Sequence, residues 1–166
     1  MSRPDELAPI PLFKDLTEEQ LRAVAAVLRP RAVRAGETIL TEGERSDSVY
    51  VLMDGTVETT KRLGVPALDG STKEIEKVLV RLSAPQFFGE IGLLEEGERS
   101  ATVRAATNCR LEELRRADLE RLVEADVRLG YVMVRNIALV LVTRLRRTDH
   151  DVLKLTAALS LALGNR

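Results

Sequence analysis

The sequence is poor in the residues that build disulfides and metal centres. Its 166 residues include one cysteine, Cys109, and one histidine, His150. A single thiol cannot form an internal disulfide, which favours a reducing cytoplasm as the location. A single histidine cannot supply the several imidazoles of a typical protein metal site, so we expect no metal. Cys109 lies in a segment with the pattern of a strand, and we interpret it as a small buried hydrophobic residue.

Long apolar runs and an excess of charge of one sign are also absent. No stretch approaches the roughly 20 apolar residues of a membrane-spanning helix, and the first six residues lack the apolar core of a signal peptide. Lysine and arginine number 25 against 26 aspartate and glutamate, which gives a formal net charge of -1. Because no global positive field exists to attract nucleic acid, we do not expect DNA as a partner. Because no long apolar run exists, we do not expect a membrane as a partner either.

Motifs of catalysis are missing as well. The sequence contains no recognisable nucleophile–base pair and no P-loop of the nucleoside triphosphatases. We therefore interpret the chain as a binding protein and not as an enzyme. Its length suits one domain that can bury a hydrophobic core.

The first regular element expected from the sequence is a helix. Thr17 is a suitable N-cap, and the apolar residues Leu21, Val24 and Leu28 recur at helical spacing. Pro30 follows and is expected to end the helix.

Between residue 31 and about residue 110 the pattern changes to short strands separated by glycine, aspartate and serine. Asp54-Gly55 between two alternating segments is a strong hairpin signal. The polar insert from Gly64 to Glu74 is expected to be an exposed hairpin tip. Many short strands at this spacing indicate a barrel or jelly roll. The expected strands are Val33, 38–40, 49–53, 57–60, 76–82, 101–105 and 110–113.

The most informative stretch is FGEIGLLEEGERSAT at positions 88–102. Gly89 permits a close backbone approach, and Glu90 supplies a carboxylate that can accept a hydrogen bond from a sugar hydroxyl. The apolar turn that follows can point free N–H groups at an anion. Arg99 adds a fixed positive charge with a planar fork of donors. The candidate ligand-binding residues of this stretch are Gly89, Glu90, Ile91, Arg99, Ser100 and Ala101.

Each of these residues also has a plainer interpretation. A glycine followed by a glutamate is often a turn with a solvated acid, and a lone arginine often lies on the surface. Glu90 and Arg99 could also pair with each other as a structural ion pair. Together, however, they supply the groups that a cyclic phosphate attached to a ribose would require.

The stretch closely resembles the phosphate-binding cassette of cyclic nucleotide-binding domains of the catabolite activator protein type. That cassette consists of Phe-Gly-Glu, a short hydrophobic helix and then Arg-Ser/Ala-Ala-Thr. The glycine turns and strands between residues 36 and 57 resemble the same family, and the resemblance extends from about residue 12 to 150. It implies an α+β fold, a double-stranded β-helix (jelly-roll barrel) with an N-terminal helix and a long C-terminal helix.

The resemblance also implies a ligand and a role for each cassette residue. The ligand would be cyclic AMP, with cyclic GMP as second choice. Arg99 would pair with the cyclic phosphate, and Glu90 would hold the ribose 2′-hydroxyl. Gly89, Ser100 and Ala101 would line the phosphate with backbone or hydroxyl groups.

A long helix is expected from about Val127, and we divide the chain into a barrel domain at 1–126 and a C-terminal dimerisation and lid helix at 127–166. One apolar face of this helix can lie against the barrel: Val132, Met133, Ile137 and Val140. The second face alternates in steps of four and three, which is the heptad pattern of a coiled coil. This seam consists of Val134, Ala138, Leu141, Leu145, Thr148, Val152, Leu155, Leu159 and Ala162. It predicts a homodimer, and the alternative is an amphipathic helix packed only on its own domain.

Thr148 is the polar position of the seam. Aligned with the equivalent helix of the family, Thr148 and Asp149 fall where that helix meets the purine, although the alignment needs an insertion of about one helical turn. The alternative is that Thr148 only sets the register of the coil. The basic cluster Arg144, Arg146 and Arg147 is expected to be a solvated helix face.

The sequence therefore predicts a cytoplasmic cyclic-nucleotide sensor that transmits binding through its C-terminal helix to an unknown effector protein. Only about 18 residues follow Thr148, too few for a helix-turn-helix, so a stand-alone sensor is expected. The alternative is a ligand-free dimerisation or protein-interaction module of the same fold.

Overall fold

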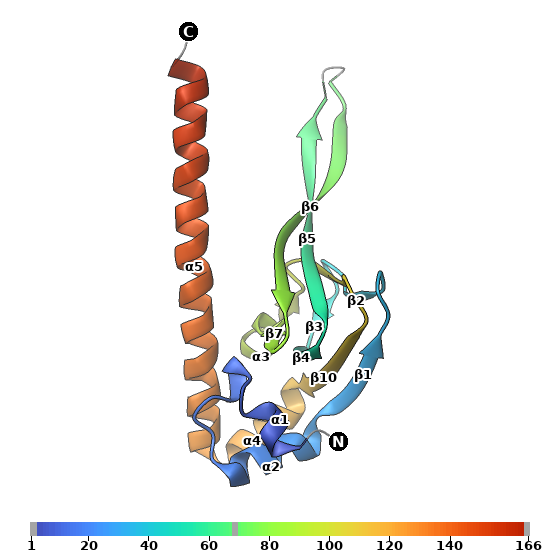
Figure 1. The fold of residues 1–166 in the computed structure, drawn as a ribbon, viewed down its shortest axis with the longest axis vertical. Coiled ribbons are helices and arrows are strands. Elements are labelled where there is room, and N and C mark those ends of the chain that lie inside the picture. Colours follow the sequence, from blue (N-terminus) through green and yellow to red (C-terminus); the bar gives the residue numbers. More distant parts are fainter. Residues whose placement is uncertain (1–2, 68–69, 165–166) are drawn as a thin grey trace.

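The computed structural model describes residues 3–67 and 70–164, and Figure 1 shows a barrel of strands flanked by one long helix. The helical elements are α1 (Pro4–Leu7), the 3-10 turn η1 (Pro11–Phe13), α2 (Glu18–Val27), α3 (Ile91–Leu94), α4 (Arg116–Ala125) and α5 (Val127–Gly164). The strands are β1 (Arg29–Val33), β2 (Thr38–Leu40), β3 (Arg45–Ser46), β4 (Ser48–Asp54), β5 (Thr56–Pro66), β6 (Thr72–Ser83), β7 (Gln86–Phe88), β8 (Gly97–Glu98), β9 (Thr102–Ala105) and β10 (Cys109–Arg115).

Two four-stranded antiparallel sheets face each other to form the barrel. One sheet has the order β1-β10-β4-β7 and the other β2-β9-β5-β6, while β3 and β8 form a small third sheet. The interior is filled by aliphatic side chains and by Tyr50 stacked on Phe88, with ring centroids 5.7 Å apart. Cys109 is buried in this core, as the sequence predicts. The predicted jelly-roll fold with flanking helices is confirmed.

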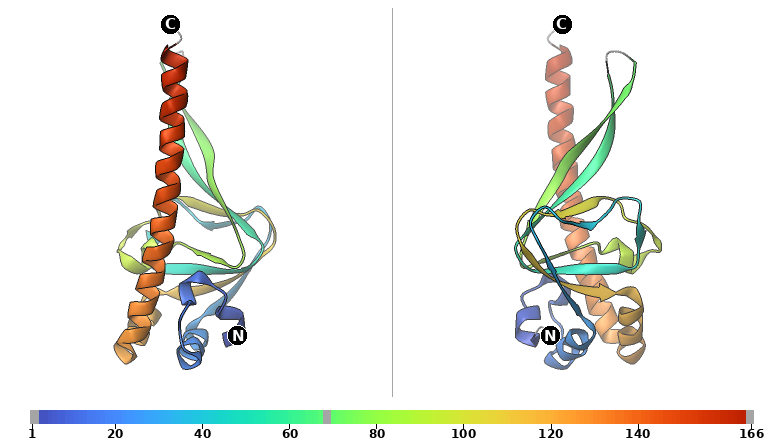
Figure 2. Two further views of the ribbon diagram at one scale, coloured as in Figure 1. Left: turned by 60° about the vertical axis from the view of Figure 1, so that its left-hand side comes forward. Right: turned by 90° about the vertical axis from the view of Figure 1, so that its right-hand side faces the viewer.

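The helices gather at one end of the barrel, where α1, α2, α4 and the first part of α5 cover a second core (Figure 2). Leu129, Met133 and Ile137 of α5 are at most 1% exposed in this core. Asn136 supports the same contact, because its amide donates to the carbonyl oxygens of Leu12 at 3.1 Å and Lys14 at 2.7 Å. The face of α5 predicted to lie on the barrel side does so.

Beyond this core α5 continues without tertiary packing. Every described residue from Leu145 to Gly164 is exposed. Figure 1 shows this half of α5 and the hairpin of β5 and β6 projecting from the same side of the barrel.

The insert from Gly64 to Glu74 lies at the outer end of the β5–β6 hairpin, as predicted for a tip, but the two strands extend further into it than predicted. It is mostly paired strand, because Gly64 faces Glu74 and Pro66 faces Thr72 in the register of β5 and β6. Its side chains are polar or exposed, so alternation of burial could not reveal these strands. The long hairpin results from continued backbone pairing beyond the body of the barrel.

The helix α2, the first element predicted from the sequence, begins at the predicted N-cap Thr17. The Thr17 hydroxyl accepts a hydrogen bond from the N–H of Gln20, and the Gln20 side chain accepts one from the N–H of Thr17. The helix ends at Val27, before Pro30 as predicted, and Pro30 itself lies inside β1. The strands β3, β7 and β8 have two or three residues each, too few for periodicity to predict.

Candidate functional site

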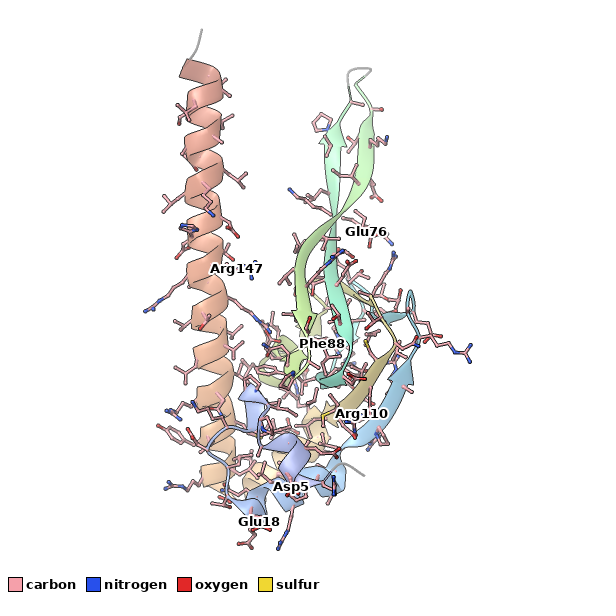
Figure 3. The ribbon with its side chains drawn as sticks, viewed as in Figure 1. Asp5, Glu18, Glu76, Phe88, Arg110 and Arg147 are labelled. Carbon is pink, nitrogen blue, oxygen red and sulfur yellow. The ribbon has the colours of Figure 1, made fainter. Side chains whose placement is uncertain are left out.

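A cavity of about 550 Å³ lies between the barrel and α5. Figure 3 labels one side chain from each side of it, Phe88 in the barrel and Arg147 on α5. Its barrel side includes all six candidate residues of the cassette: Gly89, Glu90, Ile91, Arg99, Ser100 and Ala101. Its helix side consists of Val140, Thr143, Arg144, Arg147, Thr148 and Asp151. The fold thus brings together the segments 89–101 and 140–151 of the sequence.

The backbone at Gly89 has a conformation that favours glycine. Its φ of +77° lies in the left-handed region, and a Cβ there would lie 2.9 Å from Arg99 Nη1. The short helix α3 follows directly, so the turn directs the chain from β7 into α3. Arg116 holds this helix from α4, since its Nε and Nη2 donate to the Gly92 carbonyl at 3.0 and 2.8 Å. The cassette is therefore anchored to the barrel and to the helical end.

Arg99 is buried in the wall of the cavity, with 7% of its surface exposed. Nη1 donates to the Ser48 carbonyl at 2.7 Å and to the Gly89 carbonyl at 3.2 Å, and Nη2 donates to Ser48 Oγ at 3.0 Å. Burial lowers the pKa of the Arg99 guanidinium, and nearby acidic groups, Tyr50 first, partly oppose this. An arginine keeps its charge even so. Among the described residues no carboxylate forms an ion pair with Arg99, so the alternative Glu90–Arg99 pair is wrong.

Glu90 is paired instead with a residue of α5. Arg144 Nη1 donates to Glu90 Oε1, and Arg144 Nη2 donates to the Phe87 carbonyl at 3.0 Å. The Arg144 guanidinium also lies over the Phe87 ring, 5.8 Å from its centroid. The Glu90 side chain is 6% exposed and that of Arg144 34%. The prediction of a solvated face is therefore wrong for Arg144.

The sequence contained a signal for Arg144. It lies one helical turn before Thr148, so both residues share one face of α5. A ligand contact predicted at Thr148 places Arg144 beside the same ligand.

The other predicted binding residues differ in exposure and in whether they line the cavity. Ser100 is exposed at the cavity wall and Ile91 is 42% exposed. The Thr148 hydroxyl donates to the Arg144 carbonyl at 3.1 Å, inside its own helix. Within the described chain, Thr148 and Asp151 line the cavity, whereas Asp149 does not. Whether either predicted residue contacts a base stays a prediction.

The residues that the structure describes contain neither a metal-binding cluster nor a membrane-spanning helix. No group of three or more histidine, cysteine, aspartate or glutamate side chains could hold a metal ion. None of the described helices combines the length and apolarity needed to cross a membrane.

Comparison with known proteins identifies the family. The family model of the cyclic nucleotide-binding domain matches residues 30–126, which contain the whole cassette. The chain belongs to the cyclic nucleotide-binding domain family.

Relatives of known name and structure agree with this membership. The domain is 33% identical to the cyclic AMP receptor protein of Thermus thermophilus over 86% of this chain and 60% of that protein. It is similar to the crystal structure of the Thermus thermophilus catabolite activator protein, with a TM-score of 0.69, 29% identity and coverage of 88% of this chain and 63% of that one. The regulatory domain of Toxoplasma gondii PKA, co-crystallised with cAMP, has a TM-score of 0.61, 26% identity and coverage of 72% and 42%.

Relatives of other architecture contain the domain as one part of a longer chain. Against three potassium channels, from Rhodopseudomonas palustris, Oryza sativa and Rhizobium etli, this chain spans 27%, 14% and 28% of their lengths. Family membership therefore identifies a cyclic nucleotide-binding module. It does not identify the protein or process that this module regulates.

Proposed function

We propose that this domain binds a cyclic nucleotide, cAMP before cGMP, and transmits the binding through α5 to a partner protein. The supporting observation is the single cavity of about 550 Å³ that contains both the cassette and the Arg144–Thr148 turn of α5. This volume is within the roughly 300–1,000 Å³ typical of small-ligand sites. The relative co-crystallised with cAMP supports cAMP as the first choice.

The phosphate would bind at Arg99. This guanidinium is buried, and its hydrogen bonds in the structure go to neutral oxygens. A buried cation without a paired carboxylate gains strongly from an anion, because the two charges attract in a medium of low dielectric constant. The N–H groups of Ser100 and Ala101 lie on the same wall and would bind the remaining phosphate oxygens.

The ribose would bind at Glu90. Its Oε1 accepts from Arg144, and a carboxylate has room for further hydrogen bonds, so Oε2 can accept from a 2′-hydroxyl. Because Arg144 belongs to α5, a ligand on Glu90 also changes the surroundings of a residue of the helix. This provides a direct route from the ligand to α5.

Transmission requires that the ligand binds two positions of α5 with different affinity, since equal affinity would shift no population. The two halves of α5 suit such a change. Its first half is fixed in the core by Met133 and Ile137, and every described residue from Leu145 onward is exposed. Movement can therefore occur at and beyond the turn that faces the cavity.

The exposed half would be covered by a second copy of the chain. Leu145, Val152, Leu155 and Leu159 repeat at heptad spacing and are 54–68% exposed. An isolated helix of this length is marginal in water and gains most of its stability from packing an apolar face. A parallel dimer along this seam places Thr148 both at the dimer interface and at the cavity.

The exposed seam also supports a second candidate, a ligand-free dimerisation module. Dimerisation needs no buried carboxylate or guanidinium, however. Burial of Glu90 at 4% exposure and Arg99 at 7% imposes a desolvation cost. Arg144 offsets part of this cost for Glu90, whereas the hydrogen bonds of Arg99 go to neutral oxygens, so an anionic ligand would offset the cost there. We therefore favour the sensor.

Isothermal titration calorimetry with cAMP, cGMP and 2′-deoxy-cAMP tests the proposal. A hydrogen bond to a charged group contributes roughly 1.5–3 kcal/mol. At about 1.4 kcal/mol per tenfold change, 2′-deoxy-cAMP should bind at least tenfold more weakly than cAMP. Glu90→Gln should narrow this gap, because the amide is uncharged.

The matched control is Glu95→Gln, which changes an exposed side chain of the same segment. It should leave both affinities unchanged. Absence of binding for both cAMP and cGMP would overturn the sensor and leave the dimerisation module. Equal affinity for the ribose and deoxyribose ligands would restrict Glu90 to a structural role.

A further inference from the structure

A buried hydroxyl in the cavity wall has no hydrogen-bond partner. Ser46, in β3, is 5% exposed, and its Oγ is unpaired within the described part of the chain. The same residue lines the cavity that contains the cassette. A buried hydroxyl without a partner destabilises the fold, so the protein alone gains nothing from it over a methyl group.

The hydroxyl lies beside the cassette helix at a point that excludes any side chain. A Cβ built on Gly92 would lie 2.0 Å from Ser46 Oγ and 3.0 Å from Arg99 Nη1. Ser46 and Arg99 therefore approach the same backbone atom of α3 from the cavity wall. The glycine leaves room for both groups.

Ser46 also has a fixed position relative to Arg99. Its strand β3 is paired with β8, and Ser46 faces Gly97 two residues before the arginine. The backbone N–H of Arg99 donates to the Glu44 carbonyl at 2.7 Å, which ties the two loops together. The hydroxyl and the guanidinium thus belong to one rigid corner of the cavity.

We infer that the Ser46 hydroxyl donates a hydrogen bond to the phosphate of the bound cyclic nucleotide. The inference rests on the proposed function, which places an anion at Arg99. A hydroxyl can donate or accept, and a phosphate oxygen beside it requires the donor role. Ser46 is then a determinant of affinity for the cyclic phosphate, outside the segment that contains the other phosphate contacts.

The test compares Ser46→Ala with wild type in titrations of cAMP and cGMP. Loss of a hydrogen bond to a charged group should weaken binding roughly tenfold to a hundredfold. Both nucleotides should lose affinity equally, since they share the phosphate. The melting temperature of the ligand-free protein should stay constant or rise, because the variant removes an unpaired hydroxyl.

The matched control is Ser83→Ala. The Ser83 hydroxyl is exposed and already bonded to Thr56 Oγ1 at 3.0 Å, and this variant should bind both nucleotides like wild type.

The two phosphorothioate diastereomers of cAMP supply a readout that a general distortion would not produce. Each replaces one exocyclic phosphate oxygen by sulfur, a weaker hydrogen-bond acceptor. Ser46→Ala should therefore weaken binding of one diastereomer much more than the other. An equal loss for both would assign the effect to a distorted pocket and overturn the inference.

The remaining outcomes separate this inference from the proposed function. If wild type binds cAMP and Ser46→Ala binds it equally well, the inference fails and the sensor stands. If only one nucleotide loses affinity, the hydroxyl contacts the base and not the phosphate. If wild type binds neither nucleotide, the proposed function and the inference fail together.

Discussion

The two walls of the cavity are built in different ways. The barrel wall holds Arg99 and Glu90 at 7% and 4% exposure, and hydrogen bonds from Arg116 to Gly92 fix the helix between them. The helix wall belongs to α5, where Arg144 is the last described residue bonded to the barrel and the residues from Leu145 to Gly164 are exposed.

This difference assigns different roles to the two walls. A wall of buried, mutually bonded groups is preorganised and supplies affinity, because little ordering remains to be done on binding. Under the proposed function, the wall that ends in an unsupported helix would supply the conformational change. Variants on the barrel wall should therefore change the affinity for cAMP most. Variants on α5 should change dimerisation and the coupling between the two walls.

The largest effect is expected at the centre of the barrel wall. Arg99→Ala removes one partner of a desolvated ion pair with the phosphate, which costs roughly 2–5 kcal/mol. At about 1.4 kcal/mol per tenfold change, calorimetry should show cAMP affinity reduced roughly 30-fold to several thousand-fold. The melting temperature should also fall, since the Ser48 and Gly89 carbonyls lose their donor.

Arg81→Ala is the control, because Arg81 is 71% exposed and pairs only with Glu58 at the surface. It should retain full affinity. Wild-type affinity in a folded Arg99→Ala protein would contradict the assignment of the barrel wall.

The second effect concerns the free half of the helix wall. Leu145→Glu introduces like charges at one level of the predicted coil, and sedimentation at micromolar concentration should show the dimer converted to monomer. Leu153→Glu is matched in chemistry and exposure, 68% against 61%, but lies off the seam and should remain dimeric. Affinity for cAMP should fall far less than in Arg99→Ala if Thr148 reaches only its own chain's ligand. A monomeric wild type, with ligand present, would contradict the seam.

The third effect measures the link between the walls. A double-mutant cycle of Glu90→Gln and Arg144→Ala, followed by urea denaturation, should give a coupling free energy of about 1 kcal/mol, within the usual range for contacting residues. The Arg144 side chain is about one third exposed, so solvent screens part of the interaction. The control cycle on Glu58 and Arg81, a more exposed pair, should give a smaller coupling. Equal coupling free energies in the two cycles would mean that the Glu90–Arg144 pair joins the walls no more strongly than a surface ion pair.

The smallest effect is expected at the start of α5, far from the cavity. Asp126 accepts from Gln20 Nε2 at 2.7 Å and from the N–H groups of Leu129 and Arg128 at 3.1 and 2.9 Å. These hydrogen bonds, that from Gln20 first, lower the pKa of the Asp126 carboxyl. A carboxyl with a lowered folded pKa stabilises the protein above its unfolded pKa, and the contribution is lost as the pH falls through the folded value.

Asp126→Ala should therefore melt below wild type at pH 7. The difference should close as the pH falls below about 4, the ordinary pKa of aspartate. Thermal melts across this range check the prediction, and a difference independent of pH would show that the charge of Asp126 is not the cause.

Local sequence patterns predicted much of the fold. The Thr17 N-cap and the helical period of α5 concern residues close in sequence, so a single segment specifies them. The hairpin predicted at Asp54-Gly55 is wrong. The chain does turn there, but β4 pairs with β10 and β7 whereas β5 pairs with β6 and β9 in the other sheet, and the turn signal does not encode this choice of partners. Of the long β5–β6 hairpin, the sequence predicted the strands only at 57–60 and 76–82, with a tip at 64–74. The exposed outer parts of both strands lack the alternation of burial that marks a strand.

The candidate site shows the same division between contacts within one segment and contacts between distant segments. The sequence by itself determined the cassette at 88–102, because its groups lie on one short segment and their spacing is visible in the chain. Only the tertiary structure decided that Glu90 pairs with Arg144, 54 residues away, and that the Ser46 hydroxyl meets Gly92 and Arg99. Such contacts depend on how the barrel closes and where α5 crosses it, and these are set by packing between distant segments and not by any local pattern.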